Sequence, residues 1–243
     1  MYIRIRHEVR KLLRKGYAEG VSHGFTRNLM RLFPALAPYV QTGPRENLFI
    51  RAGYTPRLAN SFFDDTGNAD NWQREVYQFA RSVCDREDLR VVCDIGCGSG
   101  YKLVTNFEGF ATIGVDLPRT CAYLRERYPG REWAESDFTK SLPQAIDMVI
   151  AADVIEHLPN PDEMLSYISE LHPRRIVLST PDRHLVGRRA ESGPPPNPAH
   201  VREWSFSEFC AYIGSVFEVD EHFISNEEQA TQCILCRPRV KVQ

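Results

Sequence analysis

The stretch that decides the fold is Val91-Val92-Cys93-Asp94-Ile95-Gly96-Cys97-Gly98-Ser99-Gly100. Its first half is short and mostly apolar, which is typical of a parallel strand covered on both faces. Three glycines at alternate positions follow, and each lacks a Cβ, so the backbone can turn sharply and approach a ligand closely. Residues 101–104 then begin a predicted helix, whose unpaired N–H groups would face that ligand. The stretch therefore predicts a strand, a turn suited to a ligand and a helix.

The glycine spacing separates two classes of nucleotide-containing ligand. The dinucleotide fingerprint is G-x-G-x-x-G, whose third glycine packs the helix on the strand. Here Tyr101 holds that third place, the glycine comes one residue early at Gly100, and Asp94 stands two residues before the first glycine. The pattern D-x-G-x-G-x-G resembles motif I of the class I S-adenosylmethionine-dependent methyltransferases.

That resemblance implies roles for the residues of the turn. In the family the loop packs against the methionine end of the cofactor, and the acid helps to hold it. The loop residues that match are Gly96, Cys97, Gly98 and Gly100, and the matching acid is Asp94. S-Adenosylmethionine is therefore the expected cofactor.

Two further acids follow predicted strands. Residues 111–115 form the second strand, which ends in Asp116, 22 residues after Asp94. A carboxylate there is well placed to accept both ribose hydroxyls, and the following Leu117 resembles the apolar residue of the family's second motif. After a short third strand at 132–135, Asp137 and Phe138 resemble the family's adenine contacts, an acid and then a backbone N–H.

The fourth predicted strand, with its apolar run at 148–152, leads into a loop at 153–160. Open α/β sheets bind ligands at the carboxyl ends of their strands. The sequence E-H-L-P at 156–159 resembles the sequence found at this place in one branch of the family. That branch contains ubiquinone-pathway O-methyltransferases and many small-molecule and sugar methyltransferases. Asp153 is accordingly a cofactor-binding and catalytic candidate.

Methyl transfer to a hydroxyl also requires removal of a proton, and an imidazole suits that task. His157 is the leading candidate for the base, and His200 is the second. The alternative for His157 is a loop residue that only holds local backbone. No metal site is predicted, because nothing in the spacing indicates a convergent set of ligands.

Strands that alternate with helices predict an α/β fold with a parallel sheet covered on both faces. A first core helix is expected at 71–84, capped by Asp70 or Asn71 and with Tyr77 as a packing residue. A fifth strand is expected at 175–180, a last helix at 206–215 and two final strands at 217–224 and 232–237. The resemblance covers residues 72–237 and implies a Rossmann-like, seven-stranded, mostly parallel sheet with one antiparallel strand. The long irregular stretch 181–204 is expected to border the acceptor pocket.

Composition agrees with an ordinary globular protein. The chain has 243 residues, 42% of them apolar, and a formal charge of −2, which does not favour a nucleic-acid binder. No apolar run approaches the roughly 18 to 20 residues of a membrane span. Seven scattered cysteines favour a reducing cytoplasm. Cys233 and Cys236 are three apart in a predicted strand, so their thiols should face opposite ways.

Residues 1–60 are predicted to be a helical or irregular extension, and 61–243 to be the methyltransferase domain. Up to Phe33 the extension has eight Lys or Arg against two Glu. Apolar residues at helical spacing over 9–17 predict a basic helix. Such a helix could bind anionic membranes, polyphosphate or RNA, or it could dock on the core or on a second subunit; the second alternative, which includes a homodimer, is favoured.

The sequence thus predicts methyl transfer to a small-molecule acceptor, most simply a hydroxyl oxygen of a sugar or secondary metabolite. An RNA or nitrogen methyltransferase that uses the basic N-terminus is one alternative. A nicotinamide-dependent Rossmann oxidoreductase is another. After the fourth strand, the residues Asp153-Val154-Ile155-Glu156 differ from the aromatic-Pro-Pro-Tyr type expected for a nucleobase or protein nitrogen.

Overall fold

The structure, a computed structural model, describes residues 48–58, 61, 63–136, 138, 142, 144–187 and 191–239. The chain divides into two compact units, residues 1–43 and 44–243, and every described residue belongs to the second. The predicted basic helix and Asp137 lie outside the described residues. The predicted domain division at residue 60 stays a prediction.

The described elements alternate between strands and helices from α4 onward. They are α4 (Arg74–Glu87), β1 (Val91–Ile95), α5 (Tyr101–Asn106), β2 (Ala111–Asp116), α6 (Pro118–Arg127), β3 (Glu132–Glu135), β4 (Met148–Ala152), η2 (Ile155–His157), α7 (Pro161–Leu171), β5 (Arg175–Pro181), α8 (Arg183–Val186), α9 (Phe206–Gly214), β6 (Phe217–Asn226) and β7 (Thr231–Pro238).

These strands form one seven-stranded sheet in the order β3-β2-β1-β4-β5-β7-β6. Neighbours from β3 to β5 are parallel, and β7 is antiparallel to both β5 and β6. The predicted Rossmann-like fold class is confirmed. The strand order reverses between β1 and β4, so the crevice beyond their carboxyl ends is where a sheet of this kind binds ligands.

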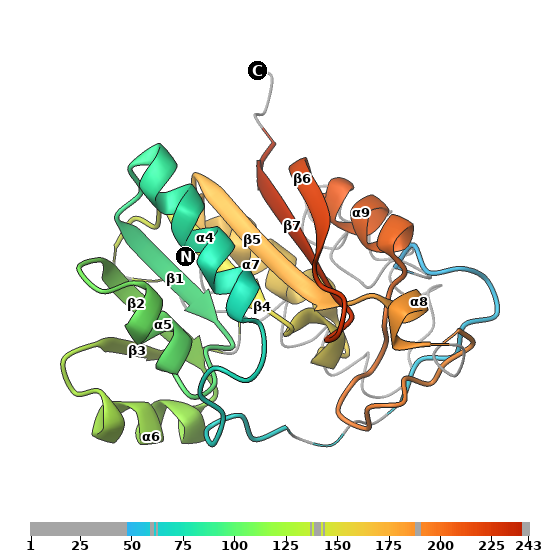
Figure 1. The fold of residues 1–243 in the computed structure, drawn as a ribbon, viewed down its shortest axis with the longest axis horizontal. Helices are drawn as coiled ribbons and strands as arrows, with labels where there is room; N and C mark the ends of the chain where they lie inside the picture. The colour runs from blue at the N-terminus through green and yellow to red at the C-terminus, as the bar shows by residue number, and fades with distance from the viewer. Residues whose placement is uncertain are drawn as a thin grey trace, which may run out of the picture. The chain divides into compact units, whose positions relative to one another are not determined.

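Each face of the sheet has its own apolar core. Residues of α4, α5 and α6 pack on one face, and residues of α7 and α9 pack on the other. Figure 1 shows α4 lying in front of the sheet and α7 behind it. β4 is buried along its whole length, as expected for a central strand that is covered on both sides.

The last strand confirms the prediction for the cysteine pair. Cys233 is in the core under α4, and Cys236 is in the core under α9, so the two thiols point to opposite faces of β7. Both are buried, and burial raises their pKa far above the usual value. They fill the core, and the strand geometry keeps them from pairing.

The start of α4 differs from the sequence prediction. A helix capped by Asp70 or Asn71 was expected, whereas α4 begins at Arg74, and Gln73 precedes it with a φ of 58°. The side chain of Gln229 accepts a hydrogen bond from the Gln73 N–H at 3.2 Å and donates one to the Asn71 carbonyl at 3.0 Å. A residue from the β6–β7 turn therefore satisfies the backbone groups that an extra helical turn would use.

Arg183 fixes one end of the long irregular stretch between β5 and α9. It is 1% exposed and donates to the carbonyl of Glu203 at 3.0 Å and to the carboxylate of Glu208 at 2.9 Å. Glu208 also closes a capping box with Ser205 at the start of α9. The stretch is thus tied to the helix that follows it.

Residues 48–58 run beside the same irregular stretch, although about 140 residues separate the two in sequence. The Thr55 N–H donates to the Ser192 carbonyl at 2.9 Å, and the Arg57 N–H donates to the Val201 carbonyl at 2.7 Å. These main-chain bonds hold residues 191–201 in place without regular secondary structure.

Trp204 packs where residues 48–58 meet the start of α9. It is fully buried, stacks on Tyr212 with ring centroids 5.5 Å apart, and donates through Nε1 to the Leu48 carbonyl at 2.9 Å. Trp204→Phe should lower the free energy of unfolding by about 1 to 3 kcal/mol, because it leaves a buried carbonyl without a donor. Urea titration measures this.

The half-exposed Trp72 provides the matched control. Trp72→Phe should change the free energy of unfolding by less than about 0.5 kcal/mol, as is usual for surface positions. Equal losses in the two variants would show that the buried hydrogen bond of Trp204 contributes nothing.

Candidate functional site

The glycine turn after β1 depends on backbone conformations that favour glycine. The φ angles are 71° at Gly96, 53° at Gly98 and 68° at Gly100. A Cβ at Gly100 would lie 2.8 Å from the ring of Trp133, and a Cβ at Gly98 would lie 3.0 Å from the carboxyl carbon of Asp65. The loop therefore packs tightly against its neighbours, as the sequence predicts for a turn that other groups approach.

Asp94 lies at the base of the turn and is fully buried. The hydroxyl of Tyr77 donates to its Oδ2 at 2.9 Å, while Oδ1 has no hydrogen-bond partner among the described residues. Burial raises the pKa of this carboxyl from 3.8 to about 7, and the nearby charges of Asp116 and Asp65 add to the rise. A buried acid with an unused oxygen is suited to a cationic ligand.

Asp116 ends β2 beside the same turn. Its two carboxylate oxygens accept the N–H of Gly98 at 2.9 Å and the N–H of Leu117 at 2.7 Å. Burial raises the pKa of Asp116, and these two hydrogen bonds oppose the rise. Leu117 itself is about half exposed. The predicted ribose acid and its apolar neighbour thus lie together at the edge of the glycine loop.

The third predicted contact region is only partly described, because Asp137 lies outside the described residues. Phe138 has a φ of 62°, and its N–H donates to the hydroxyl of Ser136 at 2.8 Å. Its ring lies 5.8 Å from that of Tyr167 on α7. In this structure Ser136 therefore accepts the hydrogen bond from the Phe138 N–H, the group that the family resemblance assigns to adenine binding.

Asp153 follows β4 with a φ of 53°. The hydroxyl of Ser179 donates to its carboxylate at 2.6 Å, and the side chain of Gln73 provides a second hydrogen bond. Burial raises the pKa of Asp153. The residue connects β4, β5 and the segment before α4 at the crevice where the strand order reverses.

His157 ends η2, four residues beyond Asp153. Its Nδ1 lies 2.9 Å from the carbonyl of Ala199, an arrangement in which Nδ1–H donates and Nε2 holds the lone pair. Burial lowers its pKa to about 4, so the ring is neutral near pH 7. The ring of Phe63 stacks on it with centroids 6.2 Å apart.

His200 meets His157 edge to face, with ring centroids 4.8 Å apart. Its Nδ1 lies 2.7 Å from the carboxylate of Glu203, which is itself buried. Its Nε2 lies 2.9 Å from the amide nitrogen of Asn197, so this nitrogen accepts while Nδ1–H donates. The structure therefore brings the two predicted histidines together although 43 positions separate them in sequence.

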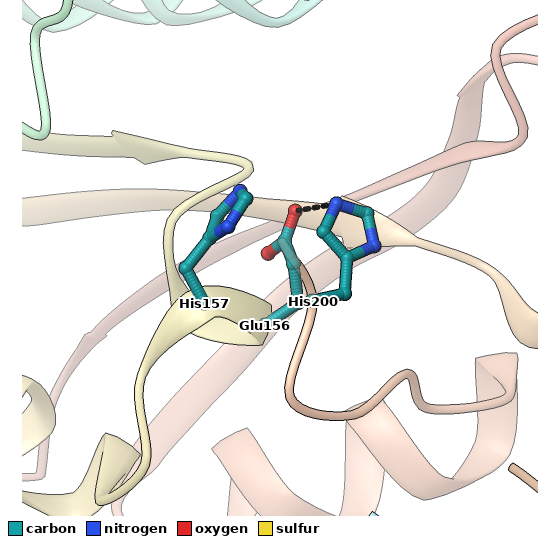
Figure 2. A group of neighbouring side chains, drawn as sticks. All are labelled: Glu156, His157 and His200. Carbon is teal, nitrogen blue, oxygen red and sulfur yellow. Dashed lines mark ion pairs between the residues drawn. The ribbon is translucent and has the colours of Figure 1, made fainter. Parts of the chain in front are cut away.

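Glu156 completes this group from the buried side. Its Oε2 accepts from the hydroxyl of Thr180 at 3.0 Å. In the described part of the chain its Oε1 has no hydrogen-bond partner, and this atom lies 4.0 Å from Nε2 of His200. Burial and the nearby charge of Asp153 raise its pKa. Figure 2 shows the carboxylate of Glu156 between the two imidazole rings.

Glu156, His157 and His200 each offer one ligand atom, and these atoms lie within 4.8 Å of one another. Two imidazoles and a carboxylate form a donor set that divalent cations accept. The sequence indicated no such set, because His200 comes from a distant loop. Glu156 stands directly beside the predicted base, and its adjacency to His157 was the one signal available.

Other contributors were also missed. Tyr77 was expected to be a packing residue, yet its hydroxyl holds Asp94. Lys102 lies over the Tyr77 ring at 5.6 Å and donates to the carbonyl of Ala69 at 3.4 Å. Neither residue belongs to a recognisable motif, so only the fold places them at the turn.

Comparison with known proteins identifies the family. The family model described as a methyltransferase domain matches residues 55–230. The chain belongs to this methyltransferase family. S-Adenosylmethionine is its cofactor. The glycine turn, the unpartnered Oδ1 of Asp94 and the acid at the end of β2 all fit a ligand with a cationic end and a ribose.

One protein similar in sequence and two solved structures of similar fold show how far the similarity extends. The mitochondrial ubiquinone biosynthesis O-methyltransferase of Saccharomyces cerevisiae is 27% identical over 135 residues, which cover 48% of this chain and 42% of the yeast protein. The mitomycin 7-O-methyltransferase MmcR is 18% identical with a TM-score of 0.52, over 68% of this chain and 53% of MmcR. Streptomyces venezuelae DesVI is 13% identical with a TM-score of 0.55, over 70% of this chain and 93% of DesVI.

The chain thus spans less than half of the yeast enzyme and about half of MmcR. The two solved structures support the fold of the methyltransferase. Among the helices in the described part of the chain, none has the length and apolar character needed to cross a bilayer.

Proposed function

We propose that this methyltransferase transfers a methyl group from S-adenosylmethionine to a hydroxyl oxygen of a small-molecule acceptor, such as a sugar or a secondary metabolite. The proposal rests on the two imidazoles of His157 and His200, which lie together beside the crevice of β1 and β4. The hydrogen bonds of each ring place its proton on Nδ1 and its lone pair on Nε2. The O-methyltransferase named among the sequence relatives supports oxygen as the acceptor atom.

On the cofactor side, each proposed role follows from position. Asp116 and Leu117 are proposed to hold the ribose and adenine, together with Asp137 and Phe138. Gly96, Cys97, Gly98 and Gly100 are proposed to cradle the methionine end above Asp94. S-Adenosylmethionine supplies a methyl group activated by its sulfonium, so the protein chiefly supplies orientation.

On the acceptor side, His157 is proposed to receive the hydroxyl proton at Nε2. The Ala199 carbonyl fixes the ring in the tautomer that can do so. His200 is proposed to position the acceptor, because Asn197 already donates to its Nε2. Asp153 is proposed to shape the floor between the two ligands through its bond with Ser179.

A second candidate mechanism comes from the same side chains. Within the described residues the buried Oε1 of Glu156 has no hydrogen-bond partner, and two imidazoles lie beside it. A divalent cation held by Glu156, His157 and His200 would lower the pKa of a bound hydroxyl and remove the need for a protein base. Removal of the cation with EDTA tests this mechanism.

Location and assembly are also proposals. All seven cysteines are free thiols and six of them are buried, which supports a reducing compartment such as the cytoplasm. A homodimer through the N-terminal extension is proposed from the basic helix predicted there. Gel filtration with light scattering measures the oligomeric state directly.

The proposed activity is tested by binding and then by turnover. Calorimetry should detect S-adenosylmethionine and S-adenosylhomocysteine at micromolar concentrations and no binding of NADH. With a labelled methyl group, phenolic or sugar hydroxyls should accept label, whereas a small RNA should not. Binding of NADH alone, or label in RNA alone, would overturn the proposal.

A further inference from the structure

The segment before α4 contacts the glycine turn and the start of α5. Its Asp65 lies against Gly98, where the backbone leaves no room for a Cβ. The carbonyl of Ala69, four residues later, accepts from Lys102 at the start of α5. Residues 63–73 therefore border the place where the family's cofactor has to bind.

Asp65 has an unused carboxylate oxygen. Its Oδ1 accepts from the side-chain amide of Asn68, and within the described residues no hydrogen bond or ion pair involves its Oδ2, the atom nearest Gly98. The preceding Asp64 differs. Its Oδ1 accepts from the hydroxyl of Thr66 at 2.6 Å, and its other oxygen lies 3.7 Å from Arg119.

Three carboxylates surround the turn. The charges of Asp116 and Asp65 oppose ionisation of Asp94, whereas the Tyr77 hydrogen bond and the charge of Lys102 favour it. Asp94 is fully buried, and no described residue donates a hydrogen bond to its Oδ1. Like charges this close repel one another, and a buried oxygen without a hydrogen bond costs free energy. A bound cation with N–H donors would lower both costs, because it offsets the negative charge and donates to the oxygen.

We infer that Asp65 binds the α-ammonium group of S-adenosylmethionine through Oδ2, and that Asp94 faces the same group from beneath the turn. The inference rests on the cofactor assignment and deepens it. An ammonium group has three N–H donors, whereas a sulfonium has none, so an open carboxylate oxygen matches the ammonium.

Calorimetry with three ligands tests this binding role. S-Adenosylmethionine and S-adenosylhomocysteine both have the ammonium, and 5′-methylthioadenosine lacks the amino-acid part altogether. Asp65→Asn should weaken the first two by about 10- to 100-fold, the usual loss for a hydrogen bond to a charged group. Binding of 5′-methylthioadenosine should stay within about twofold.

Asp64→Asn is the matched control, because it removes a neighbouring charge that faces Arg119 instead of Gly98. It should leave all three affinities unchanged. Thermal unfolding of both variants should match the wild type, since each side chain lies outside the core.

The other results each exclude the inference. Unchanged or tighter binding in Asp65→Asn would show that the carboxylate is not a ligand. Loss for S-adenosylmethionine alone would assign the contact to the sulfonium, and equal loss for all three ligands would assign it to the shape of the turn. If the wild type binds none of the three, the cofactor assignment itself fails, which is a separate outcome.

Discussion

His157→Ala is expected to slow methyl transfer by roughly 10² to 10⁴, the range typical of general acid–base catalysis. The affinity for S-adenosylmethionine should barely change, because His157 lies on the loop after β4 and not on the glycine turn. Single-turnover rates with a hydroxyl acceptor, together with calorimetric cofactor affinity, measure the two quantities separately.

His200→Gln is the informative companion. His200 already accepts from Asn197 and is held by Glu203, so its loss should raise the KM of the acceptor more than it lowers kcat. A large loss of kcat at His200 with a mild effect at His157 would assign the base to His200. If neither variant slows transfer more than a few-fold, no protein base is needed.

Chelation distinguishes the base from the cation mechanism. A protein base predicts that EDTA leaves the wild-type rate unchanged. A rate that falls with EDTA, returns with Mg²⁺, Mn²⁺ or Zn²⁺, and is absent in Glu156→Gln would support a cation held by Glu156, His157 and His200. Metal titration of the wild type against Glu156→Gln then reports the site without depending on turnover.

Asp94→Asn is expected to stabilise the cofactor-free protein at high pH while weakening cofactor binding. In the folded chain, burial raises the pKa of Asp94 from 3.8 to about 7. At 1.36 kcal/mol per pKa unit, the ionised carboxylate costs roughly 4 kcal/mol of stability. The asparagine has a similar shape and no charge to bury, so it should avoid this cost.

The pH window follows from the direction of that shift. Between about pH 4 and 7 the folded protein holds a proton that the unfolded chain releases, so the stability contributed by Asp94 falls as pH rises through this window. The cost is complete above pH 7 and absent below pH 4. Urea titrations at both limits should therefore show the advantage of Asp94→Asn only at high pH; an advantage independent of pH would contradict the raised pKa.

The sheet was predictable because most of its strands are short apolar runs that can be recognised from the local sequence. The apolar runs at β1, β4 and β5 are short, and each ends at a turn residue or a charge. The seven-stranded, mostly parallel sheet and its single antiparallel strand came from the family resemblance and are confirmed. The first turn of α4 was mispredicted because Gln229, 156 positions away, satisfies its backbone.

The candidate site divides in the same way. Asp94, the glycines and Asp116 belong to motifs in which neighbours along the chain are also neighbours in space, so the sequence places them. Glu156 and His200 converge only through folding of the loop at 191–201. Contacts between residues far apart in sequence produce no periodic pattern that could predict them. The hydrogen bond from Tyr77 to Asp94 likewise follows no fixed sequence spacing.

The pairing of residues 48–58 with 191–201 has a consequence for engineering acceptor preference. The loop that contains His200 accepts hydrogen bonds from the N–H groups of Thr55 and Arg57, which lie far from it in sequence. If that loop alone were replaced by the loop of a relative, its carbonyl groups would shift, and the N–H groups of Thr55 and Arg57 would lose their acceptors. A successful graft therefore has to move both segments as a matched pair, and single-segment chimaeras should lose the alignment of His200 before they acquire a new acceptor.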